Sequence, residues 1–301
     1  MTSYLLIANP ASGSGRACHR ADLLANSLPD SCQVEVVETK CRGSAAEIAA
    51  DRGSDVDRVI AVGGDGTLNE ILSGLMARGL PSKARPALGF LPSGTGNAAT
   101  RAFGFSSDPI LVARSLPTVP VRPVDVGVVT HAGGERPFLL WLGAGFDAVL
   151  IAALHVSRTG RMGVTGLLRK LPEVLRAVAR YQAPDIEVEV DGTEFGVACS
   201  MILPNVAKIP FGGTVAETAD PFDGLLDIVA IPRGSKLRLT QLGLSLLVSS
   251  LHRARGVRHS LGTRIGLRSE GDVPFQLDGE PVGKLPVDVR LERGAVRLLL
   301  T

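Results

Sequence analysis

In its first third the chain reads Val59-Ile60-Ala61-Val62-Gly63-Gly64-Asp65-Gly66-Thr67, an apolar run followed by three glycines around one carboxylate. The apolar run predicts a buried strand, and Leu68-Asn69-Glu70-Ile71-Leu72 behind it predicts a helix. Because glycine has no Cβ, a bulky anion can approach the backbone N–H groups at the start of that helix. The pattern indicates a phosphate-binding turn, with a purely structural turn capped by Asp65 as the alternative.

Asp65 adds a second requirement to this turn. A carboxylate repels a bare phosphate, so the arrangement makes chemical sense when a cation lies between the two. Mg²⁺ held by a carboxylate together with nucleotide phosphates is the common solution. We therefore expect a nucleotide bound with Mg²⁺.

Strand and helix patterns alternate on both sides of this turn. Apolar runs at Tyr4-Ala8, Gln33-Glu38 and Ala87-Leu91 are separated by helical stretches, which predicts a parallel sheet covered by helices. Two further loops rich in glycine, hydroxyl and amide groups, Asn9-Gly15 and Pro92-Asn97, leave strands of this sheet. Ligands of open α/β sheets bind at the carboxyl ends of the strands, so the three loops are expected to form one site. None of them matches a P-loop or a dinucleotide-binding turn.

The later part of the chain has a different pattern. Alternating residues and the dipeptide Asp191-Gly192, which predicts a two-residue hairpin turn, are typical of antiparallel strands. Helical patterns at Val164-Arg180 and Leu237-Arg255 interrupt them. With 301 residues, two domains are expected: 1-125, with 287-301 as a segment that could complete it, and 126-286.

Composition excludes several classes of protein. The net charge is +2, from 32 basic and 30 acidic residues, so the chain has no general electrostatic attraction to nucleic acid. Its four cysteines have neither zinc-site nor disulfide-framework spacing. The most apolar stretch, Phe138-Leu154, contains Asp147 and is too short for a transmembrane segment. The first residues do not resemble a signal peptide, so a cytoplasmic protein is expected.

In combination, these residues resemble the diacylglycerol kinase catalytic-domain family, which includes bacterial lipid kinases, sphingosine kinases and ceramide kinases. The resemblance covers most of the chain and implies an α/β N-terminal domain with a NAD kinase/phosphofructokinase-like parallel sheet, followed by a β-rich, β-sandwich-like C-terminal domain. The elements that carry it are Asn9-Pro-x-Ser-Gly13, Thr39 with Gly43 and Ala45, Gly63-Gly-Asp-Gly-Thr-Leu-Asn-Glu70, Pro92-x-Gly-Thr-x-Asn97, Asp125-x-Gly127, Gly145-Phe-Asp147, Asp223-Gly-Leu-Leu-Asp227 and Asp278-Gly-Glu280.

The resemblance also implies roles for individual residues. Glu280 would be the general base, Asp65 would join the metal network, and Asp278 would assist Glu280 or orient its loop. ATP would be the phosphoryl donor and Mg²⁺ the cofactor. From spacing alone, Asp278-Gly279-Glu280 fits a plain hairpin turn equally well. The residues implied to bind the nucleotide are Asn9, Thr39, Gly63, Gly64, Asp65, Gly66, Thr67, Leu68, Asn69, Ser93, Gly94, Thr95 and Asn97.

A structural Mg²⁺ site in the second domain is implied as well, held by Asp223 with Asp220 and Leu225. Asp220 stands where the family often has an apolar residue. Because the ligand at this position is the backbone oxygen, the different side chain does not remove it. Ala98 stands where many bacterial diacylglycerol kinases have an acidic residue. Sphingosine and ceramide kinases have a similar non-acidic version, so the lipid stays open.

The resemblance implies an ATP-dependent lipid kinase that phosphorylates a lipid hydroxyl of diacylglycerol, ceramide, a sphingoid base or a related lipid. Such an enzyme serves lipid metabolism and phospholipid biosynthesis at the inner face of the membrane, where it binds peripherally. Basic segments at Val156-Lys170 and Arg253-Arg258 are candidate membrane contacts, and a homodimer stays open. The alternatives are a NAD kinase-like enzyme or a sugar kinase that acts on a soluble hydroxyl, and a non-enzymatic regulator on the same fold.

Overall fold

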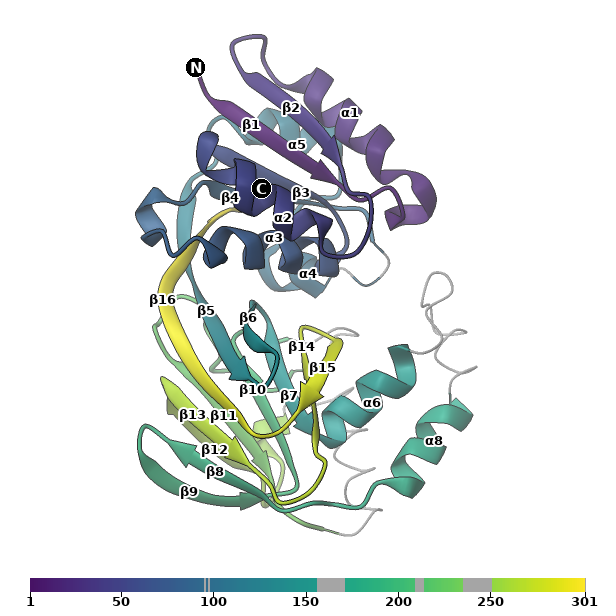
Figure 1. Ribbon diagram of the computed structural model, residues 1–301, viewed down its shortest axis with the longest axis vertical. Helices are drawn as coiled ribbons and strands as arrows, with labels where there is room; N and C mark the ends of the chain where they lie inside the picture. Colours follow the sequence, from purple (N-terminus) through teal and green to yellow (C-terminus); the bar gives the residue numbers. More distant parts are fainter. Residues whose placement is uncertain (95, 97, 156–170, 209–213, 235–250, 301) are drawn as a thin grey trace. The chain divides into compact units, whose positions relative to one another are not determined.

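A computed structural model describes residues 1–94, 96, 98–155, 171–208, 214–234 and 251–300 (Figure 1). The chain divides into two compact units. The N-terminal unit consists of Met1–Val124 and Arg293–Thr301, and the C-terminal unit consists of Asp125–Glu292. The segments Val156-Lys170 and most of Leu237-Arg255 lie outside the described residues, as do Thr95 and Asn97.

The N-terminal unit is built on a parallel sheet, as the sequence predicted. Its strands follow the order β2-β1-β3-β4, and β16 joins at β4 through the pair Leu298 and Leu88. The strands are β1 (Ser3–Ala8), β2 (Gln33–Glu38), β3 (Arg58–Gly63), β4 (Ala87–Pro92) and the end of β16 (Val287–Leu299).

Both faces of β1, β3 and β4 are buried, which explains why these strands are almost continuously apolar, whereas the edge strand β2 is partly exposed and contains Glu35 and Glu38. Leu6 and Val62 pack against Leu24 and Val112 of helices on one face, while Ile7 is equally inaccessible on the other. The helices are α1 (Ala17–Ser27), α2 (Ser44–Arg52), α3 (Asp65–Ala77), α4 (Ala98–Phe103) and α5 (Pro109–Ser115), with short 3₁₀ helices at Ser12–Gly15, Gly53–Asp55 and Ser82–Ala84.

The start of α3 differs from the expected one. A helix was predicted from Leu68, but α3 begins at Asp65, and Gly64 is the residue that precedes it in an extended conformation. Asp65 therefore lies in the first helical turn, where a carboxylate interacts favourably with the helix dipole. The prediction was wrong because Gly66 and Thr67 are poor helix formers in a helix interior. Both residues lie in the first turn of α3, where this low propensity does not prevent the helix from forming.

The C-terminal unit contains mainly antiparallel strands. One sheet has the order β12-β11-β10-β7-β14-β15, and β13, β8 and β9 follow β16 in the other, which also contains β5 and β6. The strands are β5 (Val121–His131), β6 (Gly134–Phe138), β7 (Trp141–Gly145), β8 (Ile186–Val190), β9 (Thr193–Ala198), β10 (Ser200–Pro204), β11 (Leu226–Ile231), β12 (Arg258–Gly262), β13 (Arg264–Arg268), β14 (Pro274–Leu277) and β15 (Glu280–Lys284).

An apolar core lies between the two sheets of this unit. Residues of both sheets contribute to it, among them Phe138, Leu142, Met201 and Ile265, as expected of a β-sandwich. Helices α6 (Phe146–His155) and α8 (Leu171–Arg180) and a 3₁₀ helix at Leu251–Arg253 complete the described elements. Among the described helices, none is long and apolar enough to span a membrane.

Candidate functional site

The three glycine-rich loops of the N-terminal unit meet at the carboxyl ends of β1, β3 and β4. The N–H groups of Ser93 and Gly94 both donate to the Gly63 carbonyl, at 2.6 and 3.1 Å. Asn9 donates through its backbone N–H to Val62 and through Nδ2 to the Thr67 hydroxyl, at 3.0 and 3.1 Å. Loops that are far apart in the sequence thus form one connected surface.

The close approach of these loops depends on glycine at one position in particular. Gly13 has a φ of 63°, and a Cβ there would lie 2.4 Å from the Ser93 carbonyl oxygen. A side chain would therefore push the first loop away from the third. The backbone is left as the main lining of this edge, which suits a ligand that binds N–H groups, such as a phosphate.

Asp65 connects the second loop to the third. Its two carboxylate oxygens accept the N–H groups of Ala98 and Ala99 at 2.8 and 3.0 Å, at the start of α4. These two hydrogen bonds hold the carboxylate at the point where the second and third loops meet. Asp65 thus fixes the end of the third loop, and its carboxylate is also the type of oxygen ligand that Mg²⁺ takes in proteins.

The remaining expected nucleotide residues have mixed surroundings. Thr39 follows β2 and donates its N–H to Ala8, so it belongs to the same edge of the sheet. Leu68 is buried and its N–H bonds to the Gly64 carbonyl, which makes it a packing residue of α3. Asn69 accepts the Ser73 hydroxyl through its carbonyl. Thr95 and Asn97 lie outside the described residues.

The turn before Glu280 lies in the C-terminal unit, between β14 and β15. Asp278 and Gly279 have φ angles of 49° and 85°, the conformation of a two-residue type I′ hairpin turn. The carboxylate of Asp278 accepts three backbone N–H groups, from Leu139, Leu140 and Trp141, at 2.8, 2.8 and 3.0 Å. The Asp278 N–H also donates to the Trp141 carbonyl at 3.0 Å. Asp278 thereby attaches the turn to β7.

Glu280 is half-buried at the first position of β15. Behind it, Gly279 donates its N–H to Oε1 of Gln276 at 2.7 Å, and Nε2 of Gln276 donates to Oδ2 of Asp147 at 2.8 Å. Gln276 is completely buried. Burial raises the pKa of Asp147 to about 6, against hydrogen bonds from Gln276 and the Trp141 side chain that lower it.

The expected structural metal residues lie in the turn before β11. Oδ1 of Asp220 accepts the Phe222 N–H at 3.1 Å, and Oδ1 of Asp223 accepts the Leu225 N–H at 2.8 Å. The buried Asp125 holds this turn by accepting the Gly224 N–H at 2.6 Å.

This turn concentrates negative charge. The pKa of Asp223 is raised by burial and by the nearby carboxylates of Asp220, Asp227 and Asp125, although the Leu225 N–H lowers it. A divalent cation would relieve that repulsion. In the described part of the chain, no group of three or more His, Cys, Asp or Glu side chains is arranged to hold a metal ion, so backbone oxygens such as that of Leu225 would have to complete the ligand set.

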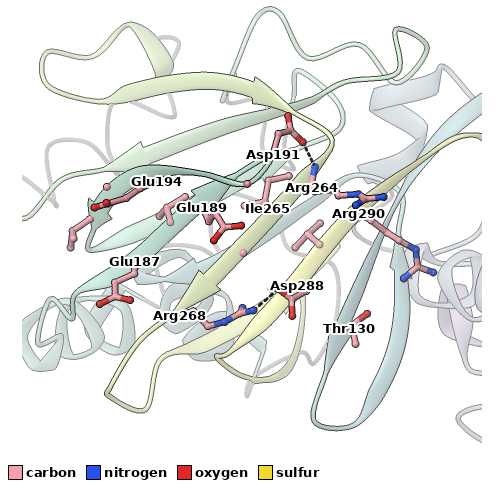
Figure 2. Close-up of a pocket in the computed structure, with 16 residues that line it drawn as sticks. Thr130, Glu187, Glu189, Asp191, Glu194, Arg264, Ile265, Arg268, Asp288 and Arg290 are labelled. Carbon is pink, nitrogen blue, oxygen red and sulfur yellow. Dashed lines mark hydrogen bonds and ion pairs between the residues drawn. The ribbon is translucent and has the colours of Figure 1, made fainter.

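A depression of about 770 Å³ lies elsewhere, on the outer face of β8, β9, β13 and β16 (Figure 2). Side chains of both charges line it, and Arg268 pairs with Asp288 at 2.5 Å. None of the described residues expected at the site is among its lining. We interpret this surface as the solvated face of a charged sheet.

Comparisons with known proteins agree on one family. The family model described as "Diacylglycerol kinase catalytic domain" matches residues 3–129, and the one described as "YegS C-terminal NAD kinase beta sandwich-like domain" matches residues 142–300. The chain belongs to the diacylglycerol kinase catalytic-domain family. Within this family it is 31% identical over 227 residues to a Chromohalobacter salexigens protein named "Probable lipid kinase YegS-like", covering 75% of this chain and 70% of the relative.

Two more relatives of this family cover nearly the whole chain. A diacylglycerol kinase of Bacillus subtilis is 26% identical over 286 residues, which are 93% of this chain and 90% of the relative. A crystal structure of a diacylglycerol kinase from Bacillus anthracis is 24% identical, has a TM-score of 0.74 and covers 100% of this chain and 97% of that one. The structural likeness confirms the fold predicted for members of this family, an α/β unit followed by a β-sandwich-like unit.

Two buried polar residues near Glu280 were not recognised as candidates from the sequence. Asp147 was quoted within Gly145-Phe-Asp147, but without a role, and Gln276 was not singled out. Gln276 stands between Phe275 and Leu277, so period-two alternation places it on the opposite face of β14 from these apolar side chains. The signal available was weak, because an amide at such a position is usually solvated.

Proposed function

We propose that the chain is an ATP-dependent lipid kinase that transfers the γ-phosphate of ATP to a hydroxyl of diacylglycerol, ceramide, a sphingoid base or a related lipid. The observation that carries the proposal is the meeting of three glycine-rich loops at one sheet edge, with Asp65 between the second and the third. Such an edge supplies backbone N–H groups for a polyphosphate. The names of the relatives, which refer to lipid and diacylglycerol kinases, support a lipid as the acceptor.

The proposed roles divide between the two units. Residues 1-125, with 287-301, form the nucleotide domain, and residues 126-286 form the lipid domain. Glu280 accepts the proton of the lipid hydroxyl while the hydroxyl oxygen bonds to the γ-phosphorus. The bond between the γ-phosphorus and the bridging oxygen breaks, and ADP leaves with that oxygen. Loop N–H groups at Gly63 to Thr67 stabilise the charge on the phosphate oxygens, while Ser93 and Gly94 hold the third loop against the second through their N–H groups.

Mg²⁺ is proposed at two places. Asp65 would hold one ion together with the nucleotide phosphates, because its carboxylate lies where the second and third loops meet and carboxylate oxygens are ligands that Mg²⁺ takes in proteins. Asp220, Asp223 and the Leu225 carbonyl would hold a second, structural ion, and the supporting observation is that Asp220 and Asp223 lie in one turn, which the carboxylate of Asp125 also contacts. When bound, the first ion neutralises charge on the transferred phosphoryl group.

The lipid acceptor implies a place of action at a membrane surface. We propose peripheral, transient binding at the inner face of the membrane from the cytoplasm, with the Arg253-Arg258 segment as one candidate contact. A homodimer and the contacts of Val156-Lys170 are further hypotheses, and the latter segment lies outside the described residues.

The test is transfer of radiolabelled phosphate from ATP to diacylglycerol, ceramide, sphingosine and phosphatidylglycerol in mixed micelles. Wild type is compared with Asp65→Asn and Glu280→Gln, and NAD and a hexose serve as soluble acceptors. Labelled lipid that is lost in both variants supports the proposal and names the lipid. Label on NAD or the sugar, with none on any lipid, would replace it with a soluble-acceptor kinase. Omission of Mg²⁺ tests the metal requirement.

A further inference from the structure

A carboxylate and an amide are buried together behind the turn that carries Glu280. Asp147 lies in the first turn of α6 and Gln276 in β14, 129 positions apart in the chain, and they hydrogen-bond at 2.8 Å. The other end of the Gln276 amide accepts the Gly279 N–H at 2.7 Å. A buried polar pair of this kind opposes folding unless its hydrogen bonds are satisfied, so it calls for an explanation beyond packing.

The fold makes room for this pair. A Cβ on Gly143 of β7 would lie 1.7 Å from Oδ2 of Asp147 and 2.7 Å from Nε2 of Gln276. The Trp141 side chain also hydrogen-bonds to Asp147. Asp147 is therefore held over β7 from two sides, by Trp141 of that strand and by Gln276 of the neighbouring strand β14.

The amide of Gln276 can take only one orientation here. Its Nε2 faces a carboxylate, which is acceptor-only when ionised, and its Oε1 faces the Gly279 N–H, which is donor-only. Rotating the amide by half a turn would place two donors together at one end and two acceptors at the other. Asp147 thus fixes the amide, and the amide fixes the position of the Gly279 N–H.

The Gly279 N–H matters because it belongs to the Asp278–Gly279 peptide, and Glu280 is the next residue along the chain. Asp278 is held to β7 by three N–H groups, and Gly279 is held by Gln276, so both residues of the turn are attached to the body of the unit. Gly279, with a φ of 85° and no Cβ, is the residue of the turn with the greatest backbone freedom. Without the amide, the Asp278–Gly279 peptide could rotate, and Glu280 at the start of β15 could shift with it.

We propose that Asp147 and Gln276 are positioning residues that fix the Asp278–Gly279 peptide and so direct the carboxylate of the following residue, Glu280, toward the acceptor hydroxyl. The inference rests on the proposed function, because it assumes that Glu280 takes the proton. Displacement of a catalytic group by about 1 Å can lower a rate about a hundredfold. The proposal therefore predicts a loss in kcat, with little change in the affinity for either substrate.

A hairpin turn does not need such a pair in order to form. The Asp191–Gly192 turn between β8 and β9 has nearly the same φ angles, 48° and 80°. Among the described residues, no side chain accepts a hydrogen bond from the Gly192 N–H there. The turn type therefore does not require the amide of Gln276. This supports the inference that the amide holds Glu280 in position.

The experiment measures kcat and KM for ATP and for the lipid identified by the phosphate-transfer panel, in the full chain. Gln276→Leu and Asp147→Leu are each expected to lower kcat about tenfold to a hundredfold with both KM values within threefold of wild type. The double variant is expected to be no slower than either single variant, because both remove the same support. Asp147→Asn, which keeps an oxygen for Gln276, should restore most of the rate that Asp147→Leu loses.

Asp191→Ala in the other turn is the matched control, since it removes a turn carboxylate remote from Glu280 in the sequence, and it should keep the wild-type kcat. Binding of a fluorescent ATP analogue and thermal unfolding check that each variant folds. Wild-type kcat in Gln276→Leu, or multiplicative losses in the double variant, would overturn the positioning role. Failure of the proposed function is distinguishable, because then wild type itself would label no lipid, or Glu280→Gln would keep the wild-type rate.

Discussion

The C-terminal unit closes two β-hairpins with the same dipeptide, Asp191–Gly192 and Asp278–Gly279, and both aspartates have a positive φ. In each turn the aspartate carboxylate accepts neighbouring backbone N–H groups. Asp191 binds Thr263 and Arg264 beside a solvated depression (Figure 2), whereas Asp278 binds three successive residues at the start of β7.

The difference between these turns lies in what stands behind them. The second turn has a buried amide and a buried carboxylate in support, and an acidic residue follows it directly. The first is followed by Thr193 and Glu194, which are exposed. The turn type alone therefore does not distinguish a structural hairpin from a candidate catalytic one; the buried polar support does.

The largest expected effect separates the two hairpins by their acidic residues. Glu280→Gln removes the proposed base and should lower kcat for lipid phosphorylation about 10²- to 10⁴-fold, while the binding of ATP is preserved. Glu194→Gln, in the other hairpin, should keep the wild-type rate. A Glu280→Gln enzyme within threefold of wild type would remove the basis of the comparison.

Next in size is the loss of the Asp278 carboxylate. Asp278→Ala leaves three backbone N–H groups of residues 139–141 without their acceptor, and we expect the free energy of unfolding to fall by about 2–4 kcal/mol. Urea denaturation followed by tryptophan fluorescence measures this, since Trp141, the single tryptophan, lies beside the turn. An unchanged midpoint would show that water replaces the carboxylate without loss.

A smaller effect is expected at Asp191. Burial acts to raise its pKa, but hydrogen bonds from Thr263 and Arg264 outweigh burial, and the pKa is lowered in the folded state. Its stabilisation is therefore complete above the unfolded pKa of about 4 and is lost as pH falls through the folded pKa. Asp191→Ala should lower the free energy of unfolding by about 1 kcal/mol at pH 7, and the difference from wild type should shrink toward pH 3. A difference independent of pH would contradict the ionic contribution.

The smallest expected effect concerns Asp147, whose ionised carboxylate destabilises the folded state, whereas that of Asp191 stabilises it. Burial raises the pKa of Asp147 to about 6, so between pH 4 and 6 the folded state keeps a proton that the unfolded state releases. As pH rises from 4 to 6, the free energy of unfolding of wild type should therefore fall relative to that of Asp147→Asn. Above pH 6 the difference between the two should stay constant. The carboxylate is buried although the residue as a whole is partly exposed, and with solvent screening we expect an effect of roughly 1 kcal/mol. Thermal unfolding of both proteins at pH 4, 5, 6 and 7 measures the difference. A difference in stability that does not change with pH would contradict the prediction and would indicate that the carboxylate is in contact with water.

Local patterns were sufficient for much of the fold. The apolar runs predicted β1 to β4 to within a residue or two, and the dipeptide predicted the Asp191–Gly192 turn, because strand burial and turn geometry depend on neighbouring residues. The start of α3 was predicted three residues too late. The family was recognised from the order of its sequence elements, and the family models confirm it.

The sequence by itself determined the parallel sheet, the β-rich second unit and the glycine-rich loops at strand ends, since each follows from periodicity and from residues with unusual backbone freedom. Only the tertiary structure decided how the carboxylates are held. The donors to Asp278 lie 137 to 139 positions earlier in the chain, and Gln276 reaches Asp147 across 129 positions. A hydrogen bond depends on distance in space, and such distances arise only once the core has brought distant strands together.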